Sequence, residues 1–192
     1  MVHRQPSITS CVSLADTVVD PLNNRSNRTQ TGRLIIIAIK PTSQDRSLIN
    51  GTASSTTTHN HSLIDRTLSV FHITRHDTVL LVNVRQEIVS AKTKCYDSSI
   101  AAYASIYGEE ERQRSLQLLH YYQDNLLQRG LNCRALALLG DRHEQIIEAA
   151  NREHADCIVV GLHRKHRLRM KRSFSTSLMQ SSTVPVTGIN LD

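Results

Sequence analysis

The stretch CRALALLGDRHEQIIEAANREHADCIVVG, residues 133–161, is the clearest indication of the fold. It opens with the apolar run 133–138, which is typical of a buried strand. Asp141, followed three residues later by Glu144, matches the pattern that begins many helices, and apolar residues recur at helical spacing behind it. A second apolar run follows at 157–160. A strand, a helix and a strand in this order predict two parallel strands joined by a crossover helix.

The same alternation continues on both sides of this stretch. Further strands are predicted by the apolar runs 34–39, 78–84 and 184–189. Helical spacing and terminal signals predict helices starting at Ser62, between Gly108 and Gly130, and near 173–182. The mixed polar segment 85–107 gives no clear pattern. This alternation of strands and helices predicts an α/β fold. The sheet is expected to be open, doubly wound, five-stranded and parallel, with helices on both faces in a three-layer sandwich.

The chain of 192 residues suits one domain. Residues 1–31 are polar and aperiodic, which predicts a disordered N-terminal tail. The domain is expected to span 32–192, with a Ser/Thr-rich insertion at about 42–61 that is predicted to be a loop.

Composition limits the classes of protein that this chain can belong to. There is no run of about 18 apolar residues and no apolar stretch typical of a secretory signal, so a cytoplasmic protein without a membrane partner is expected. The four cysteines are scattered and form no CxxC pair, which favours buried free thiols. The histidine pairs at 59 and 61 and at 163 and 166 lack further ligands, so no metal site is expected.

Three segments carry a resemblance to a known family: Gly140-Asp141, 146–150 and 155–161. Together they are similar to the universal stress protein A family. The likeness extends over residues 33–190 apart from the insertion, and residues 38–42 resemble the end of the family's first strand. The resemblance implies a Rossmann-like fold of the adenine nucleotide alpha hydrolase type and a non-catalytic stress-response role. It also implies a homodimer that pairs through the last strand, 184–189.

Family members that bind ATP carry the motif Gly-x-x-Gly-(nine residues)-Gly-Ser/Thr, because glycine lets backbone N–H groups approach phosphate oxygens. That spacing falls here on Gly161, Arg164, Phe174 and Ser175, so two of the three glycines are replaced. The aspartate that contacts adenosine in the family falls on Lys40, which cannot accept a hydrogen bond. The resemblance therefore implies that binding of ATP or another adenine nucleotide is weakened.

A ligand crevice is expected at the carboxyl ends of the strands. Gly161 could be a turn glycine at the end of its strand or a remnant of a phosphate cradle. Nearby bases could hold phosphates by charge where glycines are lost. The candidate nucleotide-binding residues are Ala38, Lys40, Pro41, Val84, Gly161, Arg164, Lys171, Arg172, Phe174 and Ser175.

The segment 164–172 holds six basic residues and no acid, and the bases outside it equal the acids in number, so the formal net charge of +6 is local. The segment could be a solvated loop or an anion site. The alternative function is an adaptor that works without nucleotide and docks an acidic protein or RNA through this segment. No Ser-His-Asp order and no nucleophile elbow are present, so no catalysis is expected.

Overall fold

The structure, a computed structural model, describes residues 17–19, 32–50, 58–86, 98–162 and 174–191. Its sheet has the strand order β1-β4-β3-β2-β5-β6. The strands are β1 (Thr17–Val19), β2 (Leu34–Ala38), β3 (Thr78–Arg85), β4 (Asn132–Leu139), β5 (Cys157–Leu162) and β6 (Val186–Asn190). The helices are α1 (Ser43–Ile49), α2 (His59–Phe71), α3 (Ser98–Gln128), α4 (Arg142–Glu153) and α5 (Phe174–Ser181).

Strands β2 to β6 are all parallel to their neighbours, which confirms the predicted five-stranded parallel sheet. Strand β1 adds a sixth, antiparallel strand beside β4. Its residues come from the segment that the sequence assigns to the N-terminal tail. A short antiparallel strand in this place pairs backbone groups of β4 that would otherwise lie at the sheet edge.

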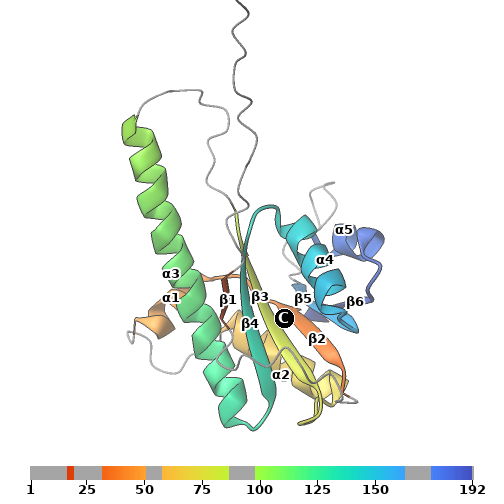
Figure 1. The fold of residues 1–192 in the computed structure, drawn as a ribbon. Coiled ribbons are helices and arrows are strands. Elements are labelled where there is room, and N and C mark those ends of the chain that lie inside the picture. Colours follow the sequence, from red (N-terminus) through yellow and green to blue (C-terminus); the bar gives the residue numbers. More distant parts are fainter. Residues whose placement is uncertain (1–16, 20–31, 51–57, 87–97, 163–173, 192) are drawn as a thin grey trace, which may run out of the picture.

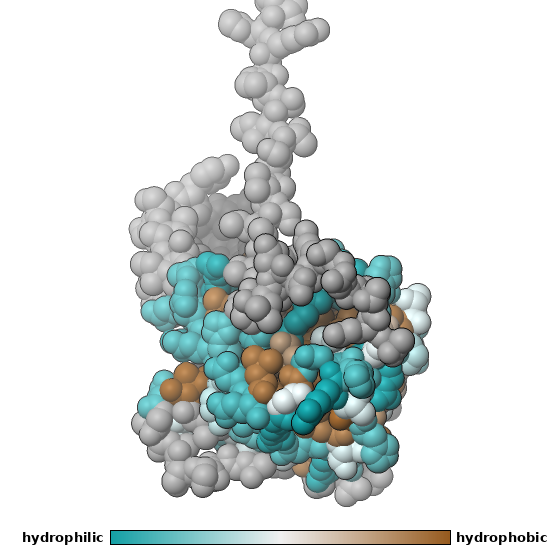
Figure 2. Space-filling view, turned by 60° about the horizontal axis from the view of Figure 1, so that its bottom comes forward, coloured by the Kyte–Doolittle hydropathy of each residue, from teal (hydrophilic) through white to brown (hydrophobic). Residues whose placement is uncertain are grey.

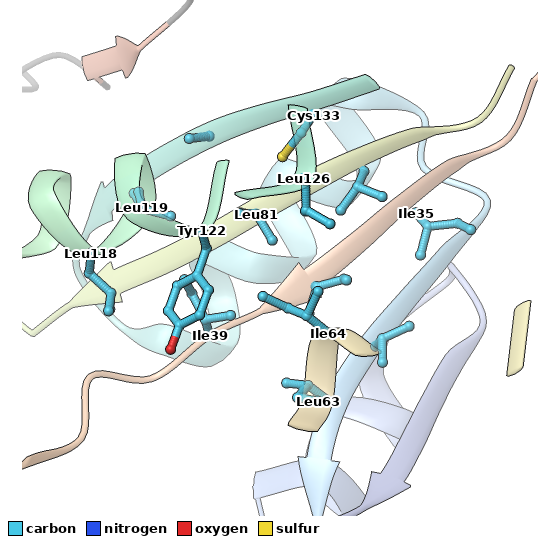
Figure 3. Close-up of a cluster of buried hydrophobic side chains, with 14 of the residues drawn as sticks. Ile35, Ile39, Leu63, Ile64, Leu81, Leu118, Leu119, Tyr122, Leu126 and Cys133 are labelled. Atoms are coloured by element: carbon cyan, nitrogen blue, oxygen red, sulfur yellow. The ribbon is translucent and has the colours of Figure 1, made fainter. Parts of the chain in front are cut away.

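Helices cover both faces of the sheet (Figure 1). Because side chains alternate along a strand, Ile35 and Ile37 pack under α2 and α3, whereas Leu34 and Ile36 pack under α4 and α5. Figure 3 shows the first of these two clusters, in which the ring of Tyr122 lies beside Ile39, just after β2. On the side drawn in Figure 2, hydrophobic residues form separate groups within a mostly hydrophilic surface.

Two predicted helix ends are confirmed. Asp141 caps α4 by accepting the backbone N–H groups of His143 and Glu144 at 2.9 and 3.1 Å. Gly130, just after α3, has a φ of 75°, a conformation that glycine adopts without strain.

The predicted loop at 42–61 is wrong in its described parts, since it contains α1 and the start of α2. Thr42 and Asp45 form a capping box at the start of α1: the Asp45 N–H donates to Thr42 Oγ1 at 3.2 Å, and the Thr42 N–H donates to Asp45 Oδ2 at 2.7 Å. Helix α2 begins at His59 behind the N-cap Thr58 rather than at Ser62.

Helix α3 begins at Ser98, ten residues before the predicted start, so Gly108 lies inside it. The acidic residues at 109–111 therefore do not form a first turn. They pair instead with Arg112 and Arg114 one turn further along the same helix. Within the described residues, no helix is both long enough and apolar enough to cross a membrane.

Candidate functional site

Strands β2 and β5 separate at the carboxyl edge of the sheet. Their ladder ends with the pair Ala38 and Val160. Beyond it, β2 follows β3, because the Ile39 N–H donates to the Val82 carbonyl at 2.9 Å. Strand β5 continues for two more residues beside β6 alone. The chain leaves β2 toward β3 and leaves β5 toward β6, so this is the switch point at which open α/β sheets bind their ligands.

The structure places four predicted site residues at these two strand ends. Lys40 and Pro41 follow β2 and are exposed, while Ala38 and Gly161 are half-buried in their strands. Val84 lies in β3, but its side chain is buried in the core under α4. Phe174 and Ser175 begin α5. The bases at 164, 171 and 172 lie outside the described residues.

A buried hydrogen-bond network fixes the turn that carries Lys40. The Asn60 side-chain amide donates to the Lys40 carbonyl at 2.9 Å and to Asp45 Oδ2 at 2.9 Å. The Thr42 hydroxyl donates to the same Asp45 oxygen at 2.6 Å. Asp45 is only 1% exposed, so these donors replace the water that a carboxylate would otherwise need.

Tyr122 of α3 completes this network. Its hydroxyl donates to Asp45 Oδ1 at 2.6 Å and lies 2.6 Å from Thr58 Oγ1. Burial, and then the hydrogen bond to Asp45, raise the pKa of Tyr122 above its ordinary value, so the hydroxyl stays protonated as a donor. The network thereby ties α1, α2 and α3 to the end of β2. Sequence reasoning missed it, although the capping pattern of Thr42 and Asp45 was a signal.

Gly161 is part of a strand and not of a turn. The strand was predicted to end at Gly161 but continues to Leu162, and Gly161 is not among the glycines with positive φ. A Cβ atom at this position would lie 2.7 Å from Leu191 Cδ1 and 3.8 Å from Leu63 Cδ2. The missing side chain therefore makes room for the side chain of Leu191, which follows β6 and packs against Gly161 on the α2 side of the sheet.

Several solved structures share this fold at low sequence identity. The hypothetical protein MJ0577 is 17% identical with a TM-score of 0.57, covering 82% of this chain and 95% of that one. The universal stress protein UspA from Lactobacillus plantarum is 12% identical with a TM-score of 0.53, covering 82% and 97%. A universal stress protein family protein from Arabidopsis thaliana with AMP bound is 17% identical with a TM-score of 0.48, covering 82% and 91%.

Among curated protein sequences, none matches this chain. Residues 55–189, in contrast, match the model of the universal stress protein family. That range contains α2, β3, α3, β4, α4, β5, α5 and most of β6, and hence one side of the switch point. The fold shared with MJ0577 and UspA agrees with this match. The chain belongs to the universal stress protein family.

Proposed function

We propose that this protein is a non-catalytic stress-response module that binds an adenine nucleotide such as ATP, with weakened affinity, where β2 and β5 separate. The observation that carries the proposal is this switch point, which brings the Lys40 turn and Gly161 to neighbouring strand ends. Family membership supports the proposal. The resemblance described above also puts the first glycine of the family's nucleotide motif at Gly161.

The reduced affinity has two physical causes at these strand ends. Lys40 cannot accept the hydrogen bond that an aspartate would accept from the adenosine. Leu191 occupies the space beside Gly161 on the α2 side, so a ligand cannot use that space without displacing it. Binding then relies on charge from the basic residues that follow β5, which are less selective than a backbone cradle.

Isothermal titration with ATP and ADP tests this proposal. We expect saturable binding in the micromolar range that is lost when Lys171 and Arg172 are both replaced by Ala. Arg75→Ala is the control, because Arg75 is an exposed basic residue just before β3, at the amino-terminal ends of the strands and away from the switch point. No heat at millimolar ATP would overturn the proposal. Phosphate release above a buffer blank would overturn its non-catalytic part.

We also propose a homodimer that pairs through β6. In the described sheet, β6 is an edge strand. One side of β6 is hydrogen-bonded to β5, and its other side pairs with no described strand. An edge strand offers backbone donors and acceptors to a second copy, and Pro185 just before it removes one donor. Light scattering should give the mass of two chains, and a purely monomeric mass would refute this pairing.

The adaptor alternative remains a prediction of the sequence, because the basic segment 164–172 lies outside the described residues. The cytoplasmic location likewise remains a prediction.

A further inference from the structure

Phe174 is the first residue of α5, and an apolar ring at this position has no role in a phosphate cradle. Its ring contacts the first turn of α4, and α4 begins just after the carboxyl end of β4. Phe174 therefore lies at the same end of the strands as the switch point. Phe174 is 37% exposed, which is high for a phenyl ring that could pack in a core.

Two side chains from the first turn of α4 lie beside the Phe174 ring. Arg142 Cζ lies 5.9 Å from the ring centroid, and the His143 ring meets the Phe174 ring edge-to-face, with centroids 6.4 Å apart and an interplanar angle of 88°. The cap at Asp141 holds this turn in place. The phenyl ring and the guanidinium thus come from two different helices and are held together before any ligand binds.

We propose that Phe174, backed by Arg142, is the stacking platform for the base of the nucleotide that binds at the switch point. This inference rests on the proposed function. A phenyl face attracts the π-face of a base, and a guanidinium adds a planar cation, whereas a phosphate gains nothing from an apolar ring. Lys40 stands where the family has the aspartate that contacts adenosine, so that contact is lost here. The platform supplies another contact to the base and gives this site a preference for a nucleotide over a bare polyphosphate.

Phe174→Leu removes the ring but keeps an apolar side chain, and Phe174→Tyr keeps the ring. Titrations of the full chain with ATP and with inorganic tripolyphosphate separate the base from the phosphates. We expect Phe174→Leu to weaken ATP binding about tenfold while the affinity for tripolyphosphate is unchanged. Phe174→Tyr should keep ATP binding within about twofold of the original chain.

Met179→Ala is the matched control, because Met179 is an exposed apolar residue, 45% exposed, further along the same helix. It should leave both affinities unchanged. The inference is overturned, and the proposed function stands, if the original chain binds ATP but Phe174→Leu binds ATP equally well or weakens both ligands alike. If the original chain binds no ATP, both fail together.

Discussion

Replacing Tyr122 with Phe removes one oxygen from the centre of the buried network and leaves the ring in place. The hydroxyl donates to Asp45 Oδ1 at 2.6 Å and contacts Thr58 Oγ1 at 2.6 Å. Tyr122 is 1% exposed, so water does not reach the vacated position without local opening. The phenyl ring still fills its place beside Ile39 in the buried cluster (Figure 3).

The expected cost follows from these two contacts. A hydrogen bond to a charged group contributes about 1.5 to 3 kcal/mol and a neutral one about 1 kcal/mol. Asp45 Oδ2 keeps its donors Thr42 and Asn60, whereas Asp45 Oδ1 loses its donor and Thr58 Oγ1 loses its contact with the hydroxyl. We therefore expect Tyr122→Phe to lower the free energy of unfolding by about 3 kcal/mol.

Urea denaturation measures this difference, with Tyr121→Phe as the matched control. Tyr121 is the adjacent residue on α3 and is 37% exposed, so loss of its hydroxyl should change stability by less than about 0.5 kcal/mol. The slope of free energy against urea should be the same in both variants. If the two variants are equally stable, the buried network does not hold the Lys40 turn as described.

Three further predictions concern the sheet and α3. Arg33 donates to both carboxylate oxygens of Asp77 at 3.1 Å and lowers the pKa of Asp77 well below its ordinary value, so the stabilisation is complete above about pH 4 and is lost as the pH falls further. Asp77→Asn should cost about 2 kcal/mol at pH 7, and urea midpoints should show this gap narrowing from pH 4 toward pH 2; a constant gap would refute the ion pair. Gly188→Ala would place Cβ 2.7 Å from Leu162 Cδ1 and should cost about 2 kcal/mol, part of which Leu162→Ala in the double mutant restores; simple additivity would contradict the contact. A Cβ atom added at Gly108 inside α3 would meet nothing within 4 Å beyond the adjoining residues of its own helix, so Gly108→Ala should raise stability by about 1 kcal/mol in thermal denaturation, and a loss would indicate that α3 does not pass through this residue.

The sheet could be predicted because its strands are continuous apolar runs, such as 34–39 and 78–84, buried on both faces. The cap at Asp141 was visible for a similar reason, since capping depends on residues three positions apart. Local signals of this kind need no knowledge of distant contacts.

The features that were missed depend on long-range contacts. Helix α1 lies in a Ser/Thr-rich segment whose composition suggests a loop, and it is held by Asp45, whose partner Tyr122 is 77 residues away. The role of Gly161 was ambiguous in the sequence because Leu191, which packs against it, lies 30 positions further along the chain. The contact of Phe174 with Arg142 likewise joins two helices and has no signature in local spacing.

The proposed binding of an adenine nucleotide where β2 and β5 separate can be located by an amide NMR titration of the full chain with ATP. We predict that the largest changes in amide chemical shift fall on Lys40, Gly161 and Leu162. The amide shifts of Gly130 and Asp156, which lie at the amino-terminal ends of the strands, should stay unchanged. Shift changes that are largest at the amino-terminal ends of the strands, or no changes at millimolar ATP, would contradict binding at the switch point.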